Sequence, residues 1–180
     1  MKNNNKVFIA RSLDGYIADR DGGLDWLNMV PNPDQLDLGY EKFIGGVDAI
    51  VMGRATFEVV CSFDMDWPYN KPVFVLSNSL SSLPEQYEGK AELLKGSLSQ
   101  ILEEIHQKGF TRLYIDGGAT ITNFLKEDLI DVITITTIPV LLGGGSPLFG
   151  EFPSKMEFEH VESVLHLDAL VQDTYRRKRA

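Results

Sequence analysis

The sequence predicts one α/β domain spanning residues 1–180, a three-layer sandwich on a mostly parallel mixed sheet with an antiparallel C-terminal hairpin. Strand-like and helix-like segments alternate along most of the chain, which is typical of right-handed crossovers between parallel strands. Several strand-like segments are continuously apolar, as expected for strands covered on both faces. The last two have no helix between them, so we expect them to form the hairpin.

The strand-like segments are short apolar runs bounded by polar or glycine-containing stretches. They are Val7–Ser12, Ala49–Met52, Pro72–Ser77, Arg112–Ile115, Val132–Val140, Phe158–Leu165 and Ala169–Tyr175, with Leu167-Asp168 as the hairpin turn. Asp19–Pro33 is rich in Gly, Asp, Asn and Pro, which predicts an irregular loop.

Helix candidates lie between the strands, at Asp34–Ile44, Arg54–Val60, Ser97–Gln107 and Ala119–Lys126. The third is the clearest, because Ser97 or Ser99 can cap its start and Gly109 follows its end. Met1–Lys6 reads as a polar lead-in, and the basic run Arg176–Arg179 as a solvated, partly frayed tail.

Composition narrows the function. The formal net charge of −9 argues against binding to nucleic acid or anionic membranes, since both require counter-charge. The single cysteine, Cys61, fits a reducing cytoplasm, and no apolar run is long enough for a signal peptide or a membrane span. The three histidines have no metal-ligand spacing, so we expect no metal site.

The most informative feature is Asp116-Gly117-Gly118-Ala119-Thr120, where an apolar strand breaks at glycines and restarts as a helix. The free N–H groups at such a helix start suit a phosphate, although a plain turn has the same pattern. Met52-Gly53-Arg54 repeats the arrangement, and Arg54 adds a planar guanidinium; its alternative reading is an exposed side chain.

These breaks should converge, because ligands of open α/β sheets bind at the carboxyl ends of the strands. The rule selects the loops Arg11–Gly15, Gly53–Thr56, Ser77–Ser79 and Asp116–Thr120. Neither the Rossmann fingerprint nor the P-loop pattern is present, so a dinucleotide would be held by a different arrangement.

The motifs resemble a known superfamily. Val51–Glu58, Phe74–Ser77 and Ile115–Gly118 are similar to dihydrofolate reductase in order and spacing. Ser12–Ala18, Asp116–Thr120 and Pro139–Gly145 look more like the reductase domain of the bifunctional riboflavin-biosynthesis deaminase-reductase, RibD. The resemblance covers almost the whole chain and implies the dihydrofolate reductase-like fold, NADP(H) as cofactor and a homodimer.

By position, the resemblance implies which residues hold NADPH. Ala10 and Ile17 would flank the nicotinamide, and Arg54 would lie near the 2′-phosphate. The full set of expected cofactor residues is Ala10, Ile17, Gly53, Arg54, Thr56, Leu76, Ser77, Asn78, Gly117, Gly118, Ala119, Thr120 and Ile121.

The implied reaction is hydride transfer to a C=N or C=O bond of a small pyrimidine- or pterin-like substrate, as in 5-amino-6-(5-phosphoribosylamino)uracil reductase. Dihydrofolate reduction is the alternative enzyme, and an NADP-binding sensor is the non-catalytic one. The serine and arginine that hold a ribose phosphate in the riboflavin reductases have no counterpart after Trp26, which puts both known substrates in doubt.

A carboxylate should assist protonation of the acceptor. Asp37 and Glu41 are four apart on the predicted first helix, hence on one face, although solvated charges fit them equally. Asp116 is the other candidate, since it ends a buried strand at the expected site. Trp67-Pro68-Tyr69 either walls the pocket or packs under a loop. Gly143–Gly145 could form a second anion loop, but the triple glycine favours a flexible crossover into the final hairpin.

Overall fold

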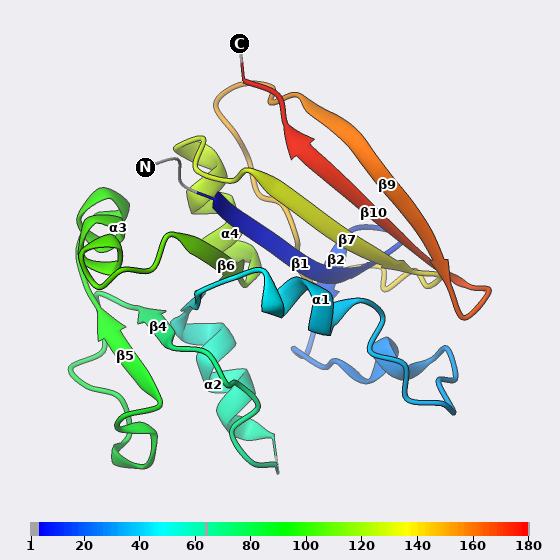
Figure 1. Cartoon of the computed structure of the whole chain (residues 1–180). Helices are drawn as coiled ribbons and strands as arrows, with labels where there is room; N and C mark the ends of the chain where they lie inside the picture. The colour runs from blue at the N-terminus through cyan, green and yellow to red at the C-terminus, as the bar shows by residue number, and fades with distance from the viewer. Residues whose placement is uncertain (1–3, 64, 180) are drawn as a thin grey trace.

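The computed structural model describes residues 4–63 and 65–179. Its centre is an eight-stranded sheet with the order β5-β4-β3-β6-β1-β7-β10-β9 (Figure 1). The strands are β1 (Asn4–Ser12), β3 (Ala49–Gly53), β4 (Val73–Leu76), β5 (Ala91–Leu94), β6 (Arg112–Asp116), β7 (Val132–Ile138), β9 (Phe158–His166) and β10 (Leu170–Arg177). A small second sheet pairs β2 (Tyr16–Ala18) with β8 (Ser146–Pro147).

The sheet is parallel from β5 to β7 and antiparallel at its C-terminal edge, as predicted. Strand β10 runs antiparallel to both β7 and β9. Leu167 and Asp168 form the hairpin turn with φ of 52° and 53°, and the Ala169 N–H donates to the His166 carbonyl oxygen. The mixed sheet and its hairpin therefore match the prediction.

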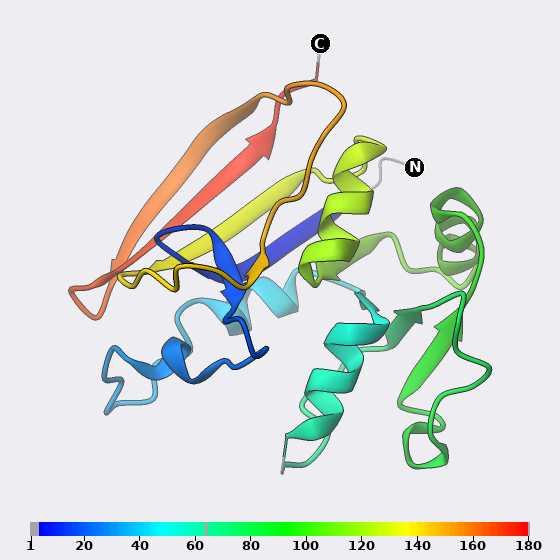
Figure 2. The same cartoon turned by 180° about the vertical axis from the view of Figure 1, so that it is seen from behind.

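Helices cover both faces and complete the three layers (Figures 1 and 2). On one face, α1 (Tyr40–Gly45) and α2 (Arg54–Ser62) pack on Ile50, Val75 and Tyr114. On the other, α3 (Leu98–Gln107) and α4 (Gly118–Lys126) pack on residues such as Val51 and Ile115. Alternate residues of one strand thus enter different cores, which explains the continuously apolar strands.

The predicted helix Asp34–Ile44 is wrong in its first half, because the helix begins only at Tyr40. Gln35, Leu38 and Gly39 have positive φ, which interrupts any helix before that point. Short 3₁₀ helices, η1 (Asp25–Asn28) and η2 (Glu85–Tyr87), and the strands β2, β5 and β8 were not predicted, since each is too short to give a periodic pattern.

Both chain ends are more ordered than the sequence suggested. Asn5 is buried in β1 and its side-chain amide donates to the Leu129 carbonyl oxygen at 2.8 Å; Met1–Asn3 of the predicted lead-in lie outside the described residues. The predicted frayed basic tail is wrong: Arg177 belongs to β10, and Arg179 pairs with Asp131 at 2.6 Å. Ion pairs with acidic side chains at this end of the sheet therefore hold the basic C-terminal residues in place.

Candidate functional site

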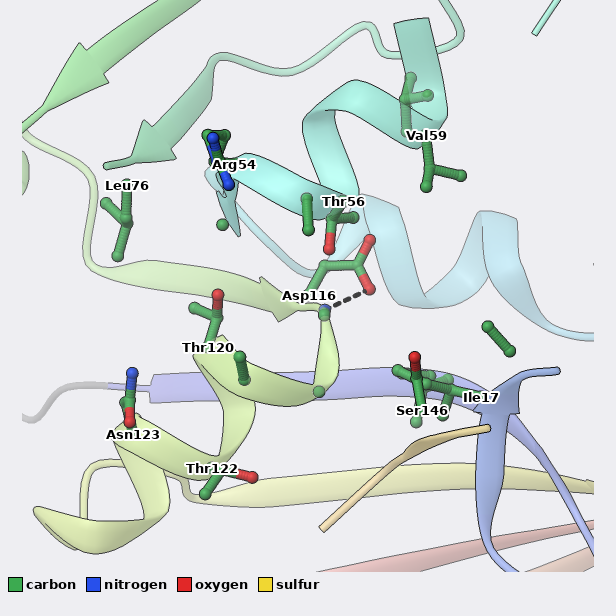
Figure 3. Close-up of a pocket in the computed structure, with 18 of the residues that line it drawn as sticks. Ile17, Arg54, Thr56, Val59, Leu76, Asp116, Thr120, Thr122, Asn123 and Ser146 are labelled. Carbon is green, nitrogen blue, oxygen red and sulfur yellow. Dashed lines mark hydrogen bonds between the residues drawn. The ribbon is translucent and has the colours of Figure 1, made fainter. Parts of the chain in front are cut away.

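A cleft of about 1360 Å³ opens at the carboxyl ends of β4, β3, β6 and β1 (Figure 3). Single small-molecule sites usually measure roughly 300–1,000 Å³, so this cleft has room for a dinucleotide together with a second molecule. Of the four loops selected from the sequence, those at Gly53, Ser77 and Asp116 contribute to its walls, whereas no residue of Arg11–Gly15 lines it. The predicted convergence on one edge therefore holds for three of the four loops.

The starts of α2 and α4 face each other across the middle of the cleft and interlock. A Cβ added at Gly53 would lie 2.7 Å from Oγ1 of Thr120, and one added at Gly117 would overlap the Thr56 hydroxyl. Each helix thus presents a threonine to the glycine that precedes the other helix. Only glycine permits this approach, and at Gly117 the φ of 90° adds a second reason.

Both helix starts leave their backbone donors available to a ligand. Among the described residues, no side chain caps α2 or α4, and neither first turn contains an acidic residue. Helix α3 differs, since Ser97 and Gln100 close its start with a capping box. Uncapped N–H groups and aligned helix dipoles make the paired starts of α2 and α4 a cradle for a diphosphate.

The end of the cleft around Leu76 is apolar with a polar rim. Leu76 lines it together with Leu94, Leu98 and Ile101. At the rim, Oδ1 of Asn78 accepts a hydrogen bond from the Gly96 N–H at 2.9 Å, which holds the β4 and β5 loops together. The guanidinium of Arg54 lies 3.8 Å from Glu58, and both side chains are about half exposed, so Arg54 is free to reorient toward an anion.

The opposite end of the cleft is built by β1, β2 and the glycine loop before β8. Ala10, Ile17 and Gly145 line it. Asp14 accepts hydrogen bonds from the N–H groups of Leu142 (3.1 Å) and Gly143 (2.7 Å). Gly143–Gly145 thus belongs to the predicted connection between β7 and the final hairpin, and Asp14 ties this loop to the end of β1; the flexibility of the loop stays a prediction.

Asp116 is the carboxylate that faces the cleft. It is half-buried at the end of β6, and its Oδ1 accepts the Gly117 N–H at 2.9 Å (Figure 3). Burial raises its pKa from 3.8 to about 6, against the opposing effect of that hydrogen bond. Asp116 can therefore bind and release a proton near neutral pH.

Tyrosines surround this carboxylate. The pKa values of Tyr40, Tyr69 and Tyr114 are all raised, first by burial and then by the charge of Asp116. The Tyr114 hydroxyl donates to the Phe8 carbonyl oxygen at 2.9 Å, which fixes that ring beside the cleft. The site therefore combines one titratable acid with neutral aromatic side chains.

The structure does not bring Asp37 into the cleft wall. Asp37 is exposed ahead of α1, where it accepts the Glu41 N–H at 2.7 Å and the Gly39 N–H at 3.3 Å. The expectation that Asp37 and Glu41 share a helical face is wrong because Asp37 precedes the helix. Its carboxylate organises the start of α1, and those hydrogen bonds lower its pKa.

The other predicted residues gather at the cleft with one exception. Ile121 is fully buried under α4, where its N–H donates to the Gly117 carbonyl oxygen and starts the helix. The predicted residues that line the cleft are Ala10, Ile17, Gly53, Arg54, Thr56, Leu76, Ser77, Asn78, Asp116, Gly117, Gly118, Ala119 and Thr120.

Sequence reasoning missed several wall residues. Phe8 and Tyr114 line the cleft from neighbouring strands. Each stands two residues before a predicted site residue, Ala10 or Asp116, so strand alternation was a usable signal. Of the alternatives for Trp67-Pro68-Tyr69, Tyr69 walls the cleft, whereas Trp67 packs against Phe57, with ring centroids 6.2 Å apart.

Within residues 4–63 and 65–179, no helix has the length and apolar character needed to cross a membrane. The same part of the chain contains no group of three or more His, Cys, Asp or Glu side chains arranged to hold a metal ion.

The architecture is the fold of the dihydrofolate reductase-like class. Enterococcus faecalis dihydrofolate reductase, solved in complex with NADP(H) and RAB-propyl, superposes with a TM-score of 0.68 at 20% identity, over 98% of this chain and 97% of its own. A Thermotoga maritima deaminase and 5-amino-6-(5-phosphoribosylamino)uracil reductase gives 0.75 at 16% identity, over 98% of this chain and 57% of that one. These likenesses establish the fold.

Within this class, the chain belongs to the RibD C-terminal domain family, whose model matches residues 6–167. A solved protein of Shewanella sp. PV-4 that carries a riboflavin-biosynthesis name is 57% identical with a TM-score of 0.95, over 98% of this chain and 99% of its own. Bacillus subtilis YwjB, an uncharacterized protein, is 35% identical over 86% of this chain and 87% of its own. The family is that of a reductase domain.

Proposed function

We propose that this protein is an NADPH-dependent reductase that transfers hydride to a C=N or C=O bond of a small pyrimidine- or pterin-like heterocycle. One observation carries the proposal: the cradle made by the starts of α2 and α4 and the Asp116 carboxyl occupy one cleft. A phosphate cradle beside a titratable acid suits a reaction that needs both a bound dinucleotide and a proton.

The residues present fit NADP(H). The uncapped starts of α2 and α4 offer backbone N–H donors to a diphosphate, and Arg54 can reach a 2′-phosphate at the exposed rim. Ala10 and Ile17 provide an apolar seat for the nicotinamide. When bound, NADPH supplies the hydride; the chain provides orientation and proton control.

Asp116 would act on the acceptor ring. In its ionised form the carboxylate accepts hydrogen bonds from ring N–H or amino groups; in its protonated form it donates a proton to ring nitrogen. Its pKa of about 6 keeps both forms accessible near neutral pH. We therefore assign Asp116 as the catalytic acid, ahead of Asp37, which caps the start of α1 outside the cleft.

Dihydrofolate reduction and NADP sensing are the competing proposals. Titration of the protein with NADPH and NADH, followed by fluorescence, tests the cradle. NADPH oxidation with a panel of aminopyrimidines and pterins then tests the chemistry. Binding of NADPH without turnover of any acceptor supports the sensor, and preferential turnover of dihydrofolate supports the folate enzyme; absence of NADP(H) binding refutes all three.

Asp116→Asn provides the matched variant for the reductase. Asparagine keeps the shape and the acceptor for the Gly117 N–H but has no titratable proton. We expect kcat/KM to fall by about 10²–10⁴-fold, the usual contribution of a general acid, with NADPH affinity unchanged. Full activity of Asp116→Asn would remove Asp116 from the chemistry.

A further inference from the structure

Resting on the proposed function, we propose that the acceptor is an uncharged, unphosphorylated flat heterocycle, and that this cleft discriminates against the phosphorylated precursors on which related reductases act. The carrying observation is the chemistry of the wall around Asp116. That part of the cleft is made of aromatic and aliphatic side chains, and the basic side chains of the cleft lie elsewhere.

The wall on the α1 and α2 face is apolar and reaches the solvent. Phe8, Tyr69 and Tyr114 stand beside Asp116, and their rings suit the faces of a flat heterocycle. Val59 and Phe63 continue the wall to the mouth, where 37% and 43% of their surfaces are exposed. Exposed apolar surface at a mouth favours an uncharged substituent over an anionic one.

The basic side chains of the cleft are at the wrong places for an acceptor phosphate. Among the described lining residues they are Arg54 and Lys126. Arg54 begins α2 on the Leu76 side of Asp116, at the end of the cleft suited to adenosine (Figure 3). Lys126 ends α4, about 12 Å along the axis from the helix start at 1.5 Å per residue.

The remaining anion site is committed to the cofactor. The free N–H groups that favour a phosphate are those at the starts of α2 and α4, which the proposed function assigns to the NADPH diphosphate. On the other side of Asp116 the lining consists of apolar side chains, glycines and Ser146, and the nearby Arg20 guanidinium does not line the cleft but donates to the Gly143 carbonyl oxygen. An acceptor phosphate there would lose its hydration without a compensating charge from a lining side chain.

Asp116 defines what the ring must offer. As an ionised carboxylate it has acceptor atoms only, so it selects a ring edge with N–H or amino groups. The tyrosine hydroxyls nearby are neutral at physiological pH, because the ordinary pKa of tyrosine is about 10 and burial raises it further. The acceptor class is thus a neutral amino-substituted pyrimidine, pterin or related ring that has no acidic arm.

Paired acceptors test this inference. With NADP⁺-loaded protein, calorimetry compares 2,5-diamino-6-ribosylamino-4(3H)-pyrimidinone with its 5′-phosphate, and unconjugated dihydropterin with dihydrofolate. NADPH oxidation is followed for the same compounds. We expect the uncharged member of at least one pair to bind and react better, by about tenfold or more. Equal or better binding of the anionic members, or binding of no member, overturns the inference.

A variant pair locates the effect. Val59→Arg places a cation at the mouth, and Val161→Arg places the same charge on β9, at a site that is 45% exposed and does not line the cleft. We expect Val59→Arg to improve binding of the phosphorylated pyrimidine about fivefold, as an exposed ion pair allows, with the uncharged compound unaffected. An equal gain in Val161→Arg overturns the assignment of this mouth.

The two proposals fail differently. Loss of the proposed function would be seen as absence of NADPH binding, measured by fluorescence before any acceptor is added. Failure of the acceptor inference leaves NADPH binding intact and reverses or abolishes the preference within the pairs. The Val59→Arg result belongs to the second case, since Val59 lies on α2 three residues after Thr56 and is not one of the cradle residues Gly53 and Thr56.

Discussion

Replacing Asp116 with asparagine should stabilise the protein while it impairs catalysis. The folded-state pKa of Asp116 is raised from 3.8 to about 6, so its ionised form is less favourable in the folded chain than in the unfolded one. Between these values the folded state binds more protons, and the free energy of unfolding therefore falls as the pH rises from about 4 to 6. Above about pH 6 the ionised carboxylate lowers the free energy of unfolding by its full amount, called the penalty below.

The magnitude follows from the pKa difference. A rise of roughly two pH units, at about 1.4 kcal/mol each, gives a penalty of about 3 kcal/mol at pH 7.5. At pH 5, where the folded protein is mostly protonated at this site, the penalty is about 1.5 kcal/mol, and at pH 3 it is near zero. Asparagine carries no charge at any of these values and keeps the acceptor for the Gly117 N–H.

Urea denaturation of the natural chain and Asp116→Asn at pH 7.5, 5 and 3 measures this difference directly. We expect the variant to be more stable by about 2–3 kcal/mol at pH 7.5, with the advantage shrinking toward low pH. A variant that is less stable at pH 7.5, or a gain in stability that does not depend on pH, would refute the assignment of Asp116 as a buried acid with a raised pKa. Such a carboxylate lowers stability for the sake of function.

Other changes probe the surroundings. Asp48 pairs with Arg112 at 2.6 Å, and this partner lowers the pKa of Asp48 to about 2. In urea denaturation, Asp48→Asn should therefore lower the free energy of unfolding by about 1–2 kcal/mol at pH 7 and by almost nothing near pH 2, the opposite sign to Asp116→Asn. A loss of stability that persists at pH 2 contradicts the ion pair. Gly118→Ala would bring a Cβ to 2.8 Å from the Pro147 carbonyl oxygen and should weaken NADPH binding about tenfold, whereas Gly45→Ala, with open space around it, should leave binding unchanged; similar affinities for both variants would exclude a tight cradle. Arg54→Glu should weaken NADPH but not NADH by about tenfold or more, as measured by fluorescence titration, and a parallel loss for both removes Arg54 from the 2′-phosphate site.

Much of the fold follows from local patterns. The buried strands are readable because each is a short apolar run, and α3 because a capping serine, regular apolar spacing and a terminal glycine coincide. The first helix was misplaced for a definite reason: Leu36 and Leu38 suggest periodicity, but the chain adopts positive φ at Leu38 and Gly39. The helix propensity of these residues does not by itself predict such a turn.

The phosphate cradle was also accessible from the sequence. Glycines after a strand and before a helix have few physical explanations, and the carboxyl-edge rule brought separate loops together. The interlock itself was not accessible, since the contact of Gly53 with Thr120 depends on β3 and β6 being neighbours. Likewise, the hydrogen bond that holds the loop at Gly143 comes from Asp14, which is far from this loop in the sequence.

The sequence by itself determined the layered α/β architecture, the edge at which a ligand binds and the glycine-based donors placed there, because these depend on local backbone preferences and strand direction. Only the tertiary structure showed which of the two carboxylates faces the cleft and which uncharged side chains line the cleft beside it. Burial and neighbouring charge arise from segments far apart in the chain: Asp37 lies in solvent at a helix start, whereas Asp116 lies among tyrosines from β6, α1 and the segment before β4.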